Sequence, residues 1–346
     1  MAGDGPVLID SNMVPFREQE KAWEPLSNLI AQDILDGLNN VSVKIGSING
    51  KLYGAAEGFQ VRSLISCFDE KDWTYEQYLD IVEKNDSGVL MFCPFIQEGR
   101  TELIYELFCR DLYDSYFIDP DNSDRPVDRQ KLERVLDDVE KYYDEKYDGS
   151  MWRDDIFNKR GVAVPAIFAG SSTSQVLLFV NKGAAAVGYP GKNGSKSYAN
   201  SGSMLVVRAN ATEEEKSAAA RFLTFLLSYE WQHKAVNKGL MSSFASRSDV
   251  ISEQMEAVTG EGARTLTYGS GLYDRVTFET DDNDVKKARE YLQYLLDSVS
   301  SGTDVNEDYR TIVYEELESY FADDIGRDAL EERLNKRVGL LLKEKK

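Results

Sequence analysis

The side chains that could perform acid-base or nucleophilic chemistry are not grouped as a hydrolytic triad requires. His233 is the only histidine, and no Ser or Cys forms an obvious nucleophile elbow to serve it. A triad needs a nucleophile within hydrogen-bond reach of its base. We therefore nominate no catalytic residue and expect His233 to lie on the surface or at a helix end.

Two carboxylates are enough for glycoside hydrolysis, so the scarcity of histidine does not exclude a carbohydrate-active enzyme. Glu57, or Asp154 with Asp155, could form such a pair. The chain carries 60 acidic residues, however, and carboxylate pairs are therefore frequent by chance. Glycan turnover remains an alternative, while our prediction is that the protein is not an enzyme.

Neither a phosphate cradle nor a metal site is indicated. The Gly-rich segment 188–195 lacks the GxxxxGK[ST] order in which backbone amides and a lysine converge on phosphates. Residues 119–124 space their oxygens as a calcium loop does, but the sharp-turn glycine is absent and Gln130 replaces the closing glutamate. We expect no metal and no cofactor.

Aromatic side chains are the most informative class, because sugars stack their CH faces on aromatic rings and bond their hydroxyls to polar neighbours. Trp152 is followed by Arg153 and Asp154, so an aromatic ring and polar groups stand side by side in the sequence. The alternative is that Trp152 starts a helix and packs into a core. Aromatics make up 11% of the chain, so both roles are available.

The composition indicates a folded, acidic protein. At 346 residues the chain is long enough for two domains, and 42% of its residues are hydrophobic. The formal net charge of -20 repels phosphate backbones, which argues against nucleic acid as a partner. Cys67, Cys93 and Cys109 have neither disulfide nor metal-ligand spacing and are expected to be core residues.

No targeting or membrane-spanning pattern is visible in the sequence. Residues 1–6 lack the basic and apolar regions of a signal peptide. No apolar run approaches the roughly 18 residues needed to cross a bilayer. We expect the chain as given to be soluble, with the signal missing if the native protein is exported.

Short apolar runs alternate with helical stripes, which indicates an α/β fold. Strands are expected at 7–10, 41–45, 51–54, 161–168, 176–180, 184–189 and 203–207. The turn at Asn49-Gly50 predicts a hairpin between the second and third of these. Capping boxes predict that helices begin at Thr74 and Thr212. Helical stripes over 285–299, 309–320 and 330–341 make the C-terminal part rich in helix.

Six separated segments of the sequence together carry a resemblance to a known protein family. They are 6–16, 50–54, 73–79, 187–194, 218–232 and 312–341. In order and spacing these resemble the extracellular solute-binding proteins of carbohydrate ABC transporters, the family 1 type that includes substrate-binding lipoproteins. The resemblance implies a two-lobed α/β clamp of the periplasmic-binding-protein type.

The resemblance also implies how the chain is divided. Residues 1–55 with 185–246 would form lobe 1, and residues 56–184 with 247–346 would form lobe 2. Family members begin with strands and helices that precede the segment matching 7–10, so lobe 1 is expected to be truncated. An uncovered strand edge invites pairing, and we expect self-association or a partner chain at this edge of lobe 1.

By resemblance, candidate ligand-binding residues come from strand ends and loops. They are Asn12, Met13, Glu57, Phe59, Trp152, Phe168, Ser171, Ser172, Tyr189 and Asn193. The implied function is to capture an extracellular carbohydrate and deliver it to the permease subunits of an ABC importer, from a position anchored to the membrane as a lipoprotein. A glycan-binding module without a transport role is a further alternative.

Overall fold

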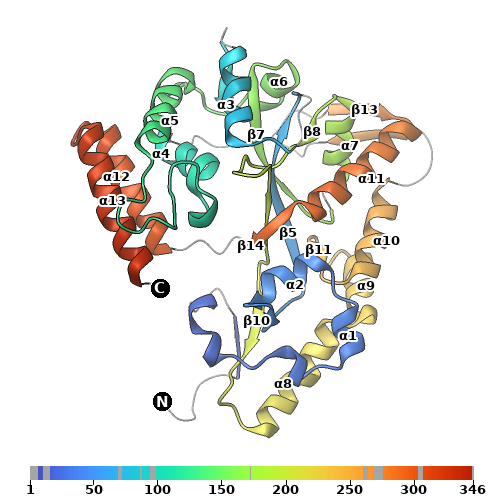
Figure 1. Ribbon diagram of the computed structural model, residues 1–346. Helices are drawn as coiled ribbons and strands as arrows, with labels where there is room; N and C mark the ends of the chain where they lie inside the picture. The colour runs from blue at the N-terminus through green and yellow to red at the C-terminus, as the bar shows by residue number, and fades with distance from the viewer. Residues whose placement is uncertain are drawn as a thin grey trace. The chain divides into compact units, whose positions relative to one another are not determined.

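The structure is a computed structural model of the chain (Figure 1). It describes residues 7–10, 16–68, 72–85, 88–93, 99–171, 173–259, 264–268, 276–302 and 307–344. Within these ranges, no helix is both long enough and apolar enough to cross a membrane.

The chain divides into two compact units. Unit 1 comprises residues 1–62, 167–181 and 197–303, and unit 2 comprises 63–166, 182–196 and 304–346. This division differs from the predicted lobes chiefly in placing 247–303 in unit 1. The reason is packing: α10 (Ser248–Thr259) lies against α9 (Tyr229–Asn237), and β14 (Val299–Gly302) pairs in parallel with β9 (Ser197–Asn200).

Unit 1 contains an antiparallel sheet in the order β1-β10-β4. Its strands are β1 (Leu8–Asp10), β10 (Met204–Val207) and β4 (Gly54–Ala56). Leu8 lies opposite Val207, and Leu205 lies opposite Ala55, so these side chains share one face. That face joins a core with the buried side of α8 (Glu213–Leu226).

Several smaller elements complete unit 1. They are η2 (Arg17–Ala22), η3 (Leu26–Asn28), α1 (Gln32–Asp36), α2 (Asn40–Gly46), β2 (Ser47–Ile48), β3 (Lys51–Leu52), α7 (Thr173–Asn181), β11 (Phe244–Ala245), β12 (Arg264–Tyr268), β13 (Val276–Thr280) and α11 (Asp282–Asp297). β5 (Gly58–Ser66) begins in unit 1, where it pairs with β9 and β11, and ends in unit 2.

Unit 2 combines parallel strands with helices. β6 (Leu90–Phe92) pairs with β7 (Gly161–Phe168), most of which belongs to unit 2, and β8 (Ala185–Ala186) pairs with β5. Its helices are α3 (Tyr75–Lys84), α4 (Arg100–Ile104), the π-helical turn η4 (Tyr105–Cys109), η5 (Leu112–Asp114), α5 (Arg129–Tyr142), α6 (Trp152–Phe157), α12 (Glu307–Phe321) and α13 (Arg327–Glu344). The mixed α/β class and the helix-rich C-terminal part are therefore confirmed.

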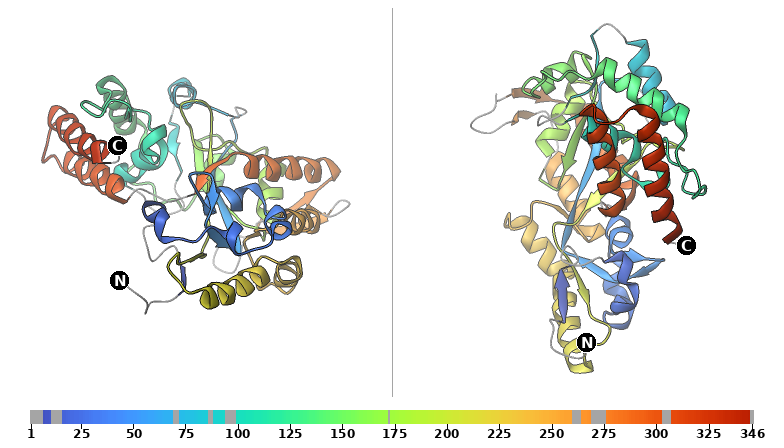
Figure 2. Two further views of the ribbon diagram at one scale, coloured as in Figure 1. Left: turned by 60° about the horizontal axis from the view of Figure 1, so that its bottom comes forward. Right: turned by 90° about the vertical axis from the view of Figure 1, so that its left-hand side faces the viewer.

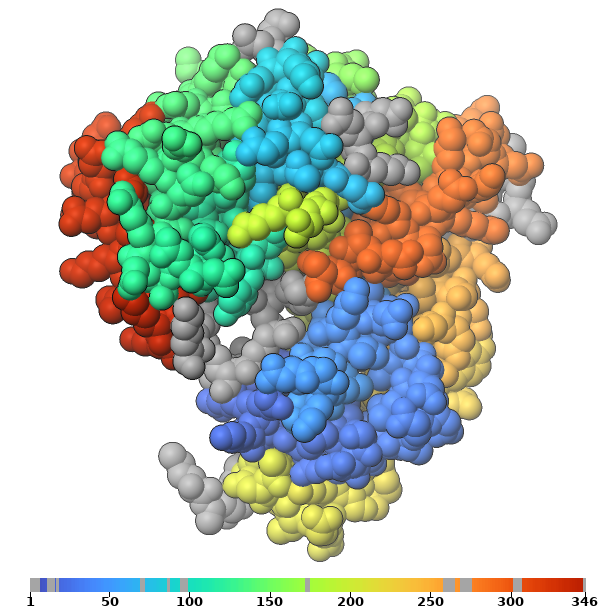
Figure 3. Space-filling view, viewed as in Figure 1, coloured from blue at the N-terminus to red at the C-terminus, as the bar shows by residue number. Residues whose placement is uncertain are grey.

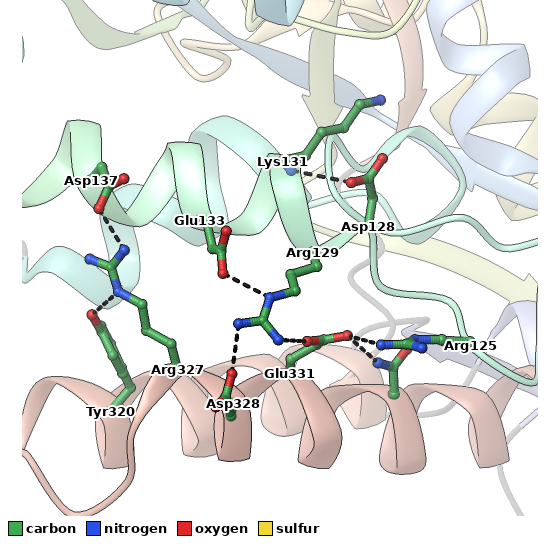
Figure 4. Close-up of polar contacts among 11 residues, drawn as sticks. Arg125, Asp128, Arg129, Lys131, Glu133, Asp137, Tyr320, Arg327, Asp328 and Glu331 are labelled. Atoms are coloured by element: carbon green, nitrogen blue, oxygen red, sulfur yellow. Dashed lines mark hydrogen bonds and ion pairs between the residues drawn. The ribbon is translucent and has the colours of Figure 1, made fainter.

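Packing and ion pairs hold the two C-terminal helices, α12 and α13, against the other helices of unit 2. α12 and α13 lie side by side, and Figure 3 shows them in red against the green part of the chain that includes α4 and α5 (Figures 2 and 3). On α13, the buried carboxylate of Glu331 accepts from Arg125 at 2.7 Å and from Arg129 at 3.3 Å (Figure 4). Removing one partner of such a group would leave a buried charge uncompensated, so these pairs fix how α13 docks on α5.

Local signals predicted several element boundaries correctly. Thr74 and Thr212 form complete capping boxes with Gln77 and Glu215, where α3 and α8 begin. The predicted turn at Asn49-Gly50 is present, but the strand that it joins to β3 is β2 and not the predicted segment 41–45. The helices expected near the C-terminus are present as α11, α12 and α13.

Two predicted strands are wrong, since both segments are helices. Residues 41–45 lie in α2, which Asn39 caps by accepting a hydrogen bond from the backbone N–H of Val41 at 2.8 Å. Residues 176–180 lie in α7, whose residues 176–179 are all buried. A short continuous apolar run fits a buried strand and a buried helix equally well.

Asp138, on α5, makes the stability of unit 2 depend on pH. Its carboxylate is buried, Oδ2 accepts no hydrogen bond from the described residues, and the Nε of Arg134 is 3.9 Å away. Desolvation, aided by the charge of Glu83, raises the pKa of Asp138 to about 6. The folded state therefore holds a proton that the unfolded state releases, and the contribution of Asp138 to stability falls as the pH rises from 4 to above 6.

We therefore expect Asp138→Asn to raise the free energy of unfolding at pH 7 by about 1–2 kcal/mol. At pH 4 the gain should nearly disappear, because the folded parent then carries a protonated, neutral Asp138 that resembles the amide of the variant. Denaturant titrations at the two pH values measure the difference. Asp144→Asn, at an exposed position, is the matched control and should show no such pH-dependent gain. An equal effect of Asp138→Asn at both pH values would contradict this account.

Candidate ligand-binding surfaces

The predicted ligand-binding residues are divided between the two units, and three of them fall outside the described residues. Asn12, Met13 and Ser172 are those three. Glu57, Phe59, Phe168 and Ser171 belong to unit 1. Trp152, Tyr189 and Asn193 belong to unit 2.

In unit 1, the two predicted phenylalanines lie in the core. Phe59 packs on Phe244 with ring centroids 5.6 Å apart. Phe168 contacts Phe179 and Tyr291 at 6.4 and 5.9 Å. Neither Phe59 nor Phe168 has exposed surface in this structure, which favours a packing role for both rings.

The predicted polar residues of unit 1 are accessible. Glu57 is half-buried and accepts a hydrogen bond from the indole Nε1 of Trp231 at 2.8 Å. Ser171 is exposed, and its backbone N–H donates to the carbonyl of Ser242 at 3.0 Å. Unit 1 therefore offers a positioned carboxylate and an exposed hydroxyl, both suited to sugar hydroxyls.

In unit 2, Tyr189 closes a hairpin-like loop. Its backbone N–H donates to the carbonyl of Lys196 at 2.7 Å, and the N–H of Lys196 returns the bond at 2.9 Å. Gly188 and Gly194 have φ values of +75° and +120°, which turn the chain at the two ends of the loop. The Tyr189 ring is buried, whereas Asn193 is exposed at the loop tip.

The 188–196 loop is docked on the start of α3. The indole N–H of Trp73 donates to the carbonyl of Gly188 at 2.8 Å. Next to it, the backbone N–H of Tyr75 donates to the carbonyl of Gly191 at 3.2 Å. Backbone groups of the loop are thereby satisfied away from water, and Asn193 is held in a defined place.

A buried ion pair fixes the same loop to η5. The side chain of Lys196 is only 8% exposed, and its ammonium contacts the carboxylate of Asp114, with Asp111 3.8 Å away. The other oxygen of Asp114 accepts the backbone N–H of Lys192 at 2.9 Å. Both carboxylates remain partly accessible, so they can also accept hydrogen bonds from a ligand.

Tyr113 is the residue of this surface that the sequence reasoning missed. It is 65% exposed, the most exposed aromatic ring among the large hydrophobic residues of the described chain. Asp111 holds it in place by accepting its backbone N–H at 2.9 Å. The signal was present in the sequence, because Asp111 and Asp114 flank Tyr113 much as polar residues adjoin Trp152.

Trp152 itself begins α6 and is only 9% exposed. The guanidinium of Arg153 lies 5.4 Å from its ring centroid. The structure therefore favours the core alternative for Trp152. Its polar neighbours also do not make a facing carboxylate pair: Asp154 is exposed, whereas Asp155 is buried and paired with Arg160 at 2.7 Å.

The remaining chemistry-bearing side chains form no further site among the described residues. No group of three or more His, Cys, Asp or Glu side chains there could hold a metal ion. The three cysteines are buried and free, and burial raises the pKa of Cys67 to about 11 and that of Cys93 to about 12. His233 lies on α9, where its Nδ1 is 2.6 Å from the Glu253 carboxylate.

Solved structures share this fold at low sequence identity. No family model and no curated sequence matches the chain. A cyclic alpha-maltosyl-1,6-maltose binding protein from Arthrobacter globiformis is 15% identical, with a TM-score of 0.53 over 97% of this chain and 84% of its own. A family 1 extracellular solute-binding protein from Alicyclobacillus acidocaldarius is 13% identical, with a TM-score of 0.53 over 98% and 85%.

A third structure, the maltose/maltodextrin-binding domain MalE from Bdellovibrio bacteriovorus bound to maltotriose, is 11% identical, with a TM-score of 0.52 over 99% of this chain and 86% of its own. These likenesses establish the fold. The resemblance to solute-binding proteins, and with it the periplasmic-binding-protein-like fold class, is confirmed.

The burial of Trp152 leads to a prediction. Trp152→Ala should lower the free energy of unfolding by about 3 kcal/mol, because it removes a large buried ring. Trp152→Phe should cost clearly less, since most of the ring volume is kept. Denaturant unfolding of the three proteins provides the measurement. If Trp152→Ala were as stable as the parent but bound ligand more weakly, Trp152 would instead be a stacking residue.

Proposed function

We propose that the chain captures an extracellular carbohydrate and delivers it to the permease subunits of an ABC importer, without chemical turnover. The observation that carries the proposal is the exposed residue Tyr113, which Asp111 and Asp114 flank in the chain, next to a docked loop that presents Asn193. The fold shared with sugar-binding proteins supports it. In the native protein we infer export and anchoring to the membrane as a lipoprotein.

The arrangement suits a sugar for a simple chemical reason. A pyranose ring has an apolar face of CH groups and an edge of hydroxyls, so it needs an aromatic platform with hydrogen-bonding groups at its rim. Tyr113 would supply the platform. Asp111 and Asp114 can accept hydrogen bonds from sugar hydroxyls, and Asn193 can both donate and accept them.

The same groups argue against hydrolysis. An inverting or retaining glycosidase needs one carboxyl group that is protonated near neutral pH and a second that acts as base or nucleophile. Asp114 instead has both carboxylate oxygens engaged within the protein, one by the ammonium of Lys196 and the other by the backbone N–H of Lys192. Glu57 accepts the indole N–H of Trp231 and has been assigned no carboxyl partner with which to form a catalytic pair.

Isothermal titration calorimetry against a panel of oligosaccharides tests the function. We expect saturable binding of at least one glycan, and chromatography of the bound material after prolonged incubation should recover it unchanged. Recovery of hydrolysed glycan would identify an enzyme. A panel without any binder would remove the carbohydrate assignment.

Tyr113 is the first residue to change in that assay. Tyr113→Ala should weaken binding about fivefold to tenfold, because a stacking contact is worth about 1 kcal/mol or more. Tyr113→Phe retains the ring and should bind nearly as well as the parent. Leu340→Ala, an exposed apolar position on α13, is the matched control and should leave affinity unchanged. Equal affinity of the Tyr113→Ala and parent proteins would exclude this surface.

A further inference from the structure

The outward face of α8 is unusually apolar for an exposed helix. Phe222 and Phe225 are 46% and 51% exposed. The opposite face of the helix, with Ala219 and Leu223, is buried in the core of unit 1. Burying these two half-exposed phenylalanines would remove apolar area from water, so this face has a modest driving force for association.

The exposed positions form one continuous stripe. Every third or fourth residue of α8 is exposed, from Glu214 through Ser217 and Ala218 to Arg221, Phe222 and Phe225. This is the spacing by which residues line a single face of a helix. The stripe begins with the acidic Glu214 and continues with the small side chains of Ser217 and Ala218. Its C-terminal half carries the larger side chains of Arg221, Phe222 and Phe225.

We propose that this stripe is the interface by which two copies of the chain associate, with their α8 helices antiparallel about a two-fold axis. Antiparallel pairing brings Phe222 over Ser217 of the partner subunit, so that a large side chain meets a small one. It also brings Arg221 within one helical turn of Glu214 of the partner subunit. The stripe is thus complementary in shape and in charge to the same stripe on a second copy, as an isologous interface requires.

The charge distribution selects a second copy as the occupant. The whole chain has a net charge of -20, which opposes contact between copies. The exposed stripe of α8, however, carries one acidic and one basic residue, Glu214 and Arg221, and is neutral. A basic partner would be attracted to the acidic remainder of the surface. Two identical acidic chains, in contrast, repel each other least when the neutral stripe of one copy faces the same stripe of the other.

Sedimentation velocity of the 346-residue chain over about 1–500 µM tests the proposal, a range set by the weak affinity expected of a small interface. We expect a concentration-dependent dimer. Phe225→Asp should raise its dissociation constant at least about tenfold, and Leu240→Asp, at another exposed apolar position, should not change it. A purely monomeric chain, or a dimer that keeps its affinity in Phe225→Asp, would overturn the proposal.

A charge exchange distinguishes this interface from any other route to a dimer, including pairing at the β1 edge. Arg221→Glu should weaken the dimer, and the double variant Glu214→Arg with Arg221→Glu should restore it, because the cross-subunit pair is rebuilt in reverse. Circular dichroism confirms that each variant is folded. Absence of rescue in a folded double variant would exclude the antiparallel pairing.

Discussion

The arrangement of η5 and the 188–196 loop in unit 2 depends on the burial of one ammonium group. Lys196 has been taken out of water, and a buried charge is tolerated only when it is paired. Asp114 supplies the pairing and at the same time binds the backbone of the 188–196 loop. The segment that carries Tyr113 and the loop that carries Asn193 therefore cannot separate without leaving charges unpaired. One electrostatic requirement thus holds the two segments of the proposed binding surface together.

Signals carried by a few neighbouring residues were readable from the sequence, and signals that depend on three-dimensional packing were not. The capping box at Thr74 and the turn at Asn49-Gly50 are local hydrogen-bond patterns, and both appear where predicted. In contrast, whether residues 176–180 form a strand or a helix depends on what surrounds them. α7 packs against α10 and α11, contacts that no local pattern specifies.

The candidate site shows the same limit for single side chains. Trp152 and Tyr113 have equivalent polar neighbours in the sequence, yet Trp152 is 9% exposed and Tyr113 is 65% exposed. Composition predicted that aromatic rings matter but could not say which rings face water. Phe59, Phe168 and Tyr189 were placed by segment likeness to strands and loops, and their rings lie inside the units. What stays accessible on those segments is polar: Glu57, Ser171 and Asn193.

The π-helical turn η4 lies directly between α4 and the segment with Tyr113. A π turn holds one residue more than an α-helical turn, and each residue added to a helix rotates everything that follows by about 100°. The surplus residue within Tyr105–Cys109 therefore rotates the residues that lead to Asp111, where extended backbone ends the helical path and η5 begins. Deleting one residue of this turn would therefore return it to α-helical register and change which side chains before Asp111 face the core.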